Sequence, residues 1–279
     1  MSQSIRTYRQ QIAAAGPALP YRHLTVSIAD RVATIAMNDP ETLNAFSIKM
    51  TSELRHAVDA MAVHSDVAAI ILTGSEGAFS AGGDLRQMKE TEVTPAERYE
   101  FIRHEFGGVI EAIARCDKPV VAAVNGHAMG VGLFAALSCD MIVAADSARF
   151  GTAYIKLALT PLGVSFILAR ALGYSRAYEF CALGSVLSTK DMRELGLINR
   201  VVADNELSGE ASAIARRLAD GPSRALAFTK QILRQVAYRD LGEHLMTGEA
   251  IQPLCLASDD HREALAAFAE KRSPRFTGV

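Results

Sequence analysis

Residues 120–132 read VVAAVNGHAMGVG, an apolar run that passes directly into a glycine-rich loop. The run is apolar throughout instead of alternating with polar residues, which is typical of a strand covered on both faces. Residues 69–74 and residues 141–146 repeat this arrangement, each leading into a further stretch that contains glycine. Because the connections between them differ in length, we predict an α/β fold built as successive turns of a βα coil whose loops collect at one end.

Upstream of these repeats the pattern predicts a β-hairpin followed by a helix. Residues 24–28 and 32–37 have strand composition and flank a turn at Ala29-Asp30-Arg31. Residues 47–62 place apolar side chains at helical spacing, so a helix is expected there.

The chain divides near residue 205, because the following sequence has the periodicity of amphipathic helices. We predict a core over residues 21–205 and a helical C-terminal oligomerisation region over residues 206–279. Residues 1–20 are expected to form a loosely ordered leader that ends at glycine and proline breaks. Its arginines faintly resemble an organellar transit sequence, a less favoured interpretation.

Composition narrows the functional classes. Lys and Arg total 29 and Asp and Glu total 31, giving a formal net charge of −2, so no general basic field would attract nucleic acid. The four cysteines are far apart without a metal-binding spacing, which favours reduced thiols in the cytoplasm and no metal. No apolar run has the length of a membrane span, and no secretory signal is recognised.

Two loops, residues 77–85 and 125–132, each follow a strand and precede a helix. Free backbone N–H groups at such a junction suit an anion or a developing oxyanion. Residues 130–135 formally match a dinucleotide fingerprint, but residues 125–129 separate that match from its strand and no Walker lysine follows. A nucleotide cofactor is therefore disfavoured.

Taken together, the two loops resemble the crotonase superfamily, which includes the enoyl-CoA hydratases and isomerases. The resemblance extends from residues 39–45 through both loops and Cys139-Asp140 to residues 267–272. It implies a ββα spiral core and a helical C-terminal region that builds a homotrimer or a dimer of trimers. The implied ligand is a coenzyme A thioester, which would be the substrate, without any further cofactor.

The resemblance also assigns residues to the site. It places an oxyanion hole at the backbone N–H groups of Gly83 and Val131. The family typically has glycine at the second position, so the Cβ of Val131 is expected to narrow the approach. The positions expected to contact the substrate are Ala45, Ala81, Asp84, Leu85, Arg86, Gly130, Phe134, Phe268 and Lys271.

Some of these contacts have a plain alternative. Arg86 would meet a phosphate of CoA, or else be a solvated surface charge. Phe268 and Lys271 match tail positions that reach the CoA of a neighbouring subunit, although Phe268 would equally suit the core. Glu41 stands where the family often has a basic residue, which weakens phosphate binding there.

The carboxylates of the related hydratases are missing. Two glutamates serve as acid and base in hydratases, and the matching positions here are Phe134 and Tyr154; a third acid of some isomerases is replaced by Leu162. Tyr154 is a proton donor but a poor base. Lys156, two residues on in an expected extended segment, would share its side and act as a base if desolvated, or would be an ordinary surface lysine.

Three functional hypotheses follow. The favoured one is a hydratase/isomerase-type enzyme with nonstandard proton carriers, performing isomerisation, hydration or decarboxylation of a CoA thioester. The second is a non-catalytic acyl-CoA-binding protein, and the third is a structural trimer. Residues 86–110 are expected to form a mobile wall that selects the acyl group, with residues 91–96 as a flexible loop.

Overall fold

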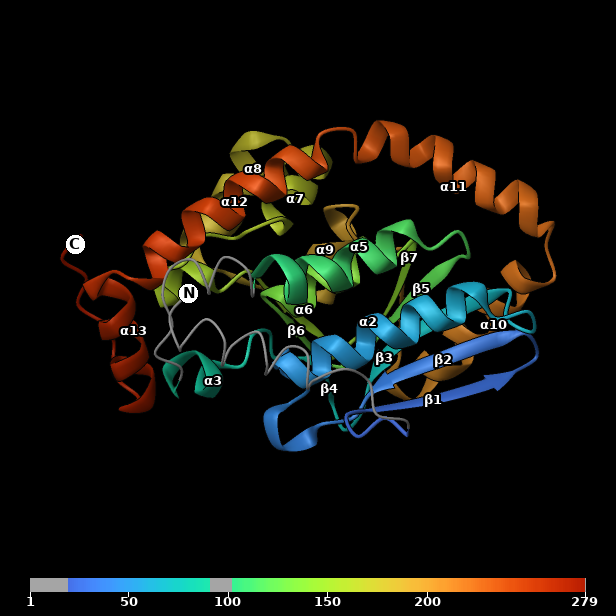
Figure 1. Ribbon diagram of the computed structural model, residues 1–279, viewed down its shortest axis with the longest axis horizontal. Coiled ribbons are helices and arrows are strands. Elements are labelled where there is room, and N and C mark those ends of the chain that lie inside the picture. The colour runs from blue at the N-terminus through green and yellow to red at the C-terminus, as the bar shows by residue number, and fades with distance from the viewer. Residues whose placement is uncertain (1–19, 91–101, 279) are drawn as a thin grey trace, which may run out of the picture.

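The computed structural model describes residues 20–90 and 102–278, and a six-stranded sheet lies at its centre (Figure 1). Its order is β1-β2-β3-β5-β7-β10, with an antiparallel β1–β2 hairpin and parallel pairing across the rest. The strands are β1 (Leu24–Ala29), β2 (Val32–Met37), β3 (Ala69–Gly74), β5 (Val120–Val124), β7 (Met141–Ala145) and β10 (Arg200–Val202). Asp30 and Arg31 form the predicted hairpin turn, both with positive φ.

A second, four-stranded sheet has the order β4-β6-β8-β9. Its strands are β4 (Ala78–Ser80), β6 (His127–Met129), β8 (Arg149–Gly151) and β9 (Val186–Ser188). β3, β5 and β7 of the first sheet are each followed by one strand of the second, and then by a helical segment. The repeated pattern predicted a βα coil, and the resemblance implied the ββα core that is observed. The difference from the pattern is that the glycine-rich stretches, expected as loops, contain these three-residue strands, which pair with one another.

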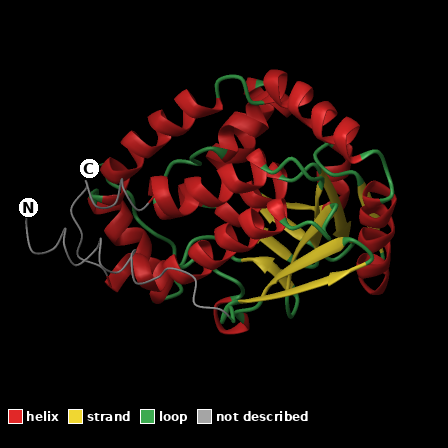
Figure 2. Ribbon diagram, turned by 45° about the vertical axis from the view of Figure 1, so that its right-hand side comes forward, coloured by secondary structure: helices red, strands yellow, loops and turns green. Residues whose placement is uncertain are grey.

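Helices cover both faces of the six-stranded sheet (Figure 2). α2 (Ile48–Val63) begins where the Ser47 hydroxyl accepts the N–H of Met50, a standard N-cap. It packs on β1, β2 and α5 (Gly108–Arg115), while α10 (Leu207–Ala219) packs on β2, β3, β5 and β7. The remaining helical segments before α10 are η1 (Pro40–Thr42), α3 (Leu85–Glu90), η2 (Ile102–Gly107), α6 (Val131–Ser138), η3 (Tyr154–Leu157), α7 (Val164–Leu172), α8 (Tyr174–Leu183), α9 (Thr189–Glu194) and η4 (Asp204–Glu206).

The end of the chain is helical. After α10 follow α11 (Ser223–Ala237), α12 (Leu241–Leu256) and α13 (Asp259–Ala269). In Figure 1, α11 lies along the upper right of the molecule, and its Lys230 reaches Asp140 and the carbonyl oxygen of Lys118 near the start of β5. α12 lies beside α7, where His244 and Ser165 form a hydrogen bond. No helix within the described residues is long and apolar enough to cross a membrane.

Candidate functional site

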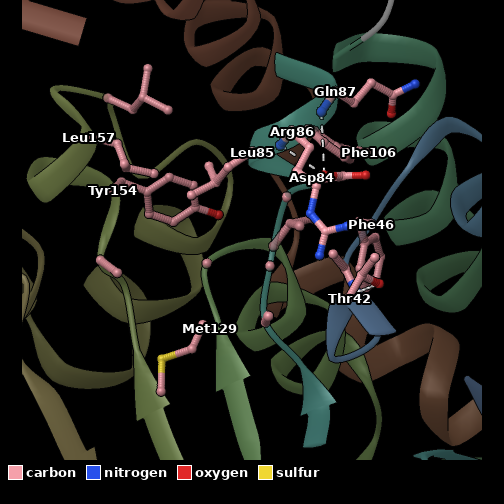
Figure 3. Close-up of a pocket in the computed structure, with 18 of the residues that line it drawn as sticks. Thr42, Phe46, Asp84, Leu85, Arg86, Gln87, Phe106, Met129, Tyr154 and Leu157 are labelled. Atoms are coloured by element: carbon pink, nitrogen blue, oxygen red, sulfur yellow. Dashed lines mark hydrogen bonds between the residues drawn. The ribbon is translucent and has the colours of Figure 1, made fainter. Parts of the chain in front are cut away.

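A cavity of about 520 Å³ opens beside the carboxyl ends of β4 and β6. Its walls come from the segment around η1, the first glycine loop, the start of α6 and η3 (Figure 3). α12 and α13 close it with Gln252, Leu256 and Phe268. Most of the lining is aliphatic or aromatic, including Ile48, Leu85, Ile102, Phe106, Met129, Leu157, Leu159 and Leu162. A concave, largely apolar cavity with a few polar groups is the usual form of a small-molecule site.

The two glycine loops meet at this cavity because β4 and β6 are parallel neighbours. Gly82 has φ +98°, and a Cβ added there would lie 2.9 Å from the carbonyl oxygen of Met129. Gly130 has φ +53° and ψ −119°, a backbone conformation that residues with a side chain rarely adopt. Glycine at both positions therefore permits the close approach of the two loops.

Two backbone donors face this meeting point. Phe46 bridges Gly83 in a parallel pair: the Phe46 N–H donates to Gly82 O and the Asp84 N–H donates to Phe46 O. This pattern leaves the N–H of Gly83 directed away from Phe46. Val131 is the first residue of α6, where an N–H has no partner within the helix. Within residues 20–90 and 102–278, neither N–H makes a hydrogen bond, and both residues line the cavity.

The first loop is held in place by two polar side chains that the sequence did not single out as site residues. The Ser80 hydroxyl accepts the N–H of Gly82 (3.1 Å) and donates to Asn44 O (2.7 Å). The fully buried Asn44 amide donates to Ala78 O (2.9 Å) and accepts the N–H of Asp39 (2.8 Å). Asn44 stands in the quoted 39–45 segment, and its positive φ is a conformation that asparagine tolerates well.

Tyr154 brings a hydroxyl group to the same point. The side chain is buried, and its hydroxyl has no hydrogen-bond partner among the described residues. A Cβ on Gly130 would lie 3.8 Å from that oxygen, so the hydroxyl lies beside the start of α6. Figure 3 shows the ring projecting into the cavity toward Leu85 at the start of α3. Burial raises the pKa of the Tyr154 phenol strongly, so the group stays protonated and is a donor.

Lys156 does not share the buried environment of Tyr154. The expectation of an extended segment at 154–156 is wrong: residues Tyr154–Leu157 form a short 3-10 helix that begins after Ala153, whose φ is +38°. Lys156 lines the cavity but is exposed. Its methylene groups lie along Gly184, where a Cβ would approach Lys156 Cε to 3.3 Å. The ammonium group is therefore not desolvated.

The two carboxylates of the cavity wall are not buried as Tyr154 is. Among the described residues that line the cavity, only Glu41 and Asp84 carry a carboxylate. Asp84 accepts the N–H groups of Arg86 (3.0 Å) and Gln87 (3.4 Å) and so caps α3. Glu41 is exposed at the mouth, where Arg86 donates to its backbone carbonyl (3.2 Å). Neither carboxylate is buried near the free N–H groups.

The structure brings most of the predicted site residues together. Those that line the cavity are Gly83, Val131, Tyr154, Lys156, Ala45, Ala81, Asp84, Leu85, Arg86, Gly130 and Phe268. Val131 has no positive φ, so a valine is accommodated at the helix start without backbone strain. Phe268 reaches the cavity of its own chain and is 65% exposed.

Two predicted residues are absent from the described cavity wall. Phe134 is buried in α6, and its ring lies against Gly163, where a Cβ would approach it to 2.4 Å. It packs in the core between α6 and α7 because its position in the helix directs it there. Lys271 lies beyond α13, exposed to solvent. The expected wall at 86–110 is described only in part, since residues 91–101, including the expected flexible loop, lie outside the described residues.

Comparison with known proteins supplies the family. The sequence model of the family described as enoyl-CoA hydratase/isomerase matches residues 27–279. The chain belongs to this family. The resemblance to the crotonase superfamily is thereby confirmed, together with the ββα fold.

Relatives of this enoyl-CoA hydratase/isomerase family member cover almost the whole chain. A 1,2-epoxyphenylacetyl-CoA isomerase of Escherichia coli is 35% identical over 249 residues, covering 88% of this chain and 95% of its own. A probable enoyl-CoA hydratase of Mycobacterium leprae is 33% identical over 260 residues, covering 93% and 99%. The crystal structure of an enoyl-CoA hydratase of Mycobacterium avium subsp. paratuberculosis superposes with a TM-score of 0.83 at 30% identity, covering 92% and 100%.

Proposed function

We propose that this family member binds an acyl-CoA thioester with its carbonyl oxygen between the N–H groups of Gly83 and Val131, and stabilises an enolate there. The single observation that carries the proposal is the convergence at one apolar cavity of three donors that have no partner among the described residues, these two amides and the Tyr154 hydroxyl. Donors fixed before the reaction stabilise developing negative charge strongly, because no reorganisation is needed when the charge forms.

Tyr154 takes the role of proton donor in this proposal. Its raised pKa keeps the phenol neutral, so it donates to the enolate and does not remove a proton from the substrate or from water. The exposed position of Lys156 gives no support for a buried base. The proposal therefore rests on Tyr154 and not on Lys156.

The lack of a buried base among the described lining residues favours one reaction over hydration. Loss of carbon dioxide from a malonyl-type thioester leaves the electron pair of the broken C–C bond on Cα, which forms the enolate without removing any proton. The two amides then hold the enolate oxygen. The Tyr154 hydroxyl gives its proton to Cα, and water in the open cavity protonates the phenolate again. Hydration, by contrast, requires a group that activates water. Decarboxylation is thus the reaction that we rank first, ahead of isomerisation and hydration, which require a proton to be removed from the substrate or from water.

A non-catalytic acyl-CoA-binding protein is the second candidate function, favoured by the same lack of a buried base. Calorimetric titration with acyl-CoA, together with turnover assays on malonyl-CoA, vinylacetyl-CoA and crotonyl-CoA, separates the two. Turnover of one thioester supports the enzyme. Tight binding of thioesters without any turnover supports the binding protein, and no binding contradicts both.

We also propose that α11 forms an interface with further copies of the chain in a homotrimer. The helix is inverted relative to an ordinary surface helix: its buried residue is Lys230, which contacts Asp140 and donates to Lys118 O (2.8 Å). Four large apolar side chains on its surface, Phe228, Ile232, Leu233 and Val236, are each at least 58% exposed. A large exposed apolar patch of this kind marks an interaction surface.

A further inference from the structure

The cavity wall contains one buried amide that the proposed enolate chemistry does not use. Gln252 lies on α12 and is 3% exposed. Its helix neighbour Leu256 lines the cavity with it, and a Cβ on Gly248, one turn earlier, would lie 3.6 Å from Leu162 Cα. This face of α12 therefore covers the segment around Leu162, which is the position where the sequence analysis noted a missing acid.

Thr160 fixes the orientation of the amide. The backbone N–H of Thr160 donates to Gln252 Oε1 at 3.0 Å, and the Thr160 hydroxyl donates to the same atom at 2.5 Å. A backbone N–H is only a donor, so the atom that faces it must be the carbonyl oxygen of the amide. The Nε2 group is consequently turned away from Thr160.

The two N–H donors of Gln252 Nε2 make no hydrogen bond among the described residues, although Gln252 is part of the cavity wall. Leu159 and Leu162 lie near Thr160 in the sequence, Leu256 lies one helical turn beyond Gln252, and these three aliphatic residues line the cavity with Gln252. Nε2 is not among the side-chain atoms that are fully shielded from solvent without a partner, so it faces the cavity. A ligand that fills the cavity displaces the water that can reach Nε2, and a ligand that supplies an acceptor there gains relative to one that does not.

The acceptor must also be neutral. The cations that line the cavity among the described residues are Arg86 and Lys156, and both are exposed. A carboxylate placed among leucines and faced only by a neutral amide would be a poorly compensated charge. A carbonyl or ether oxygen would satisfy the amide without that cost.

We infer that Gln252 determines specificity for an acyl group that is apolar but carries a neutral oxygen acceptor away from the thioester. The acyl chain fills the leucine-lined part of the cavity, and its oxygen accepts a hydrogen bond from Nε2. This inference rests on the proposed acyl-CoA function and adds a substrate class to it. Thr160 acts as a positioning residue, because it holds the amide in the required orientation.

The test measures binding of saturated acyl-CoA thioesters, so that no turnover is involved. Straight-chain thioesters from butanoyl-CoA to decanoyl-CoA are titrated calorimetrically, each paired with the analogue that carries a carbonyl at the penultimate carbon. At one or more chain lengths the oxo-acyl-CoA is expected to bind roughly tenfold more tightly than its partner. Gln252→Leu removes this preference, while Gln235→Leu, the same change at a residue of α11 that does not line the cavity, retains it.

The outcomes separate this inference from the proposed function. If acyl-CoA thioesters bind but no chain length shows a preference, or if Gln252→Leu keeps the preference, the role of Gln252 is overturned while the proposed function stands. If no thioester binds more tightly than CoA alone, the proposed function fails and this inference fails with it. Should Gln252→Leu not fold, Gln252→Met is measured in its place, and the paired titration of the unmodified chain needs no variant.

Discussion

The hydroxyl of Tyr154 lies 3.8 Å from the point where a Cβ of Gly130 would stand. A buried phenol is thus directly beside the first turn of α6, and neither this phenol nor the leading N–H of α6 has a hydrogen-bond partner in the part of the chain that the structure describes. Glycine at position 130 keeps the space between them open. The arrangement assembles donors from two distant parts of the chain around one point.

Tyr154→Phe removes only the hydroxyl from this arrangement. We expect kcat on the best thioester substrate to fall by roughly 10²-fold, because loss of one donor or general acid has about that effect. The KM should change little, since the ring and the cavity remain. Steady-state kinetics check this, and Lys156→Ala, at the exposed neighbour, is the control expected to retain activity. Equal losses in both variants would contradict the role given to Tyr154.

The raised pKa of Tyr154 makes a further prediction about pH. Because the folded protein keeps the phenol protonated above its ordinary value of about 10, kcat should show no loss from tyrosine ionisation between about pH 6 and pH 9. A pH–rate profile of the unmodified chain measures this. A basic limb in that range that disappears in Tyr154→Phe would show that the phenol ionises near neutrality, against our account.

Gly82→Ala tests the approach of the two loops. The added Cβ would combine a positive φ with a 2.9 Å contact to Met129 O, so the free energy of unfolding should fall by about 2–5 kcal/mol. Gly77→Ala is the matched control: φ there is +79°, but a Cβ meets nothing within 4 Å, and a loss of about 1–2 kcal/mol is expected. Denaturant unfolding measures both. Equal losses would mean that the contact with β6 does not constrain Gly82.

Substitution of apolar residues by glutamate tests the proposed interface on α11. Ile232→Glu together with Leu233→Glu should convert a homotrimer into monomers, because two carboxylates would be desolvated at the contact. Val63→Glu introduces the same charge at a residue that is 85% exposed on α2, and it should leave the assembly unchanged. Light scattering after size-exclusion chromatography gives the mass. A monomeric unmodified chain, or a double variant that remains trimeric, would refute the interface.

The hydrogen bonds of Glu263 lead to a prediction about how the stability of α13 and the residues after it depends on pH. Hydrogen bonds from Arg272 and from the Arg275 N–H lower the pKa of Glu263 to about 2. Because the folded pKa is below the unfolded value of about 4.3, this contribution is present above that value and is lost as the pH falls toward 2. Glu263→Gln should therefore be less stable than the unmodified chain at pH 7, and the difference should shrink between about pH 4.5 and pH 2. A difference that is constant with pH would contradict the assignment.

The local sequence was sufficient to predict the repeated elements, but it did not predict contacts between distant segments. The apolar runs that lead into glycine-containing stretches predicted β3, β5 and β7. The two loops predicted the paired donors, because strand burial and helix starts leave a short-range pattern in the sequence. The three-residue strands of the second sheet have no such pattern, since they exist only through pairing with one another. Gln252 was missed for the same reason: nothing in a helical sequence indicates that Thr160, 92 residues away, turns its amide.

Lys156 and Phe134 are two side chains whose surroundings could not be predicted from the local sequence. An extended stretch at 154–156 would have placed Lys156 beside Tyr154, but the left-handed Ala153 starts a 3-10 helix that separates their environments. Phe134 matches a catalytic position by alignment of motifs, yet its ring turns toward Gly163 in the core. In both cases the local backbone conformation decides which surroundings the side chain has, and a single sequence does not determine that conformation.

The most direct test of the central claim is a crystal structure with a bound saturated acyl-CoA. The account predicts that the thioester carbonyl oxygen lies about 3 Å from both the Gly83 and the Val131 nitrogen atoms, with the Tyr154 hydroxyl within reach of the same oxygen or of Cα. A thioester carbonyl bound elsewhere in the cavity, with the two amides left to water, would contradict it.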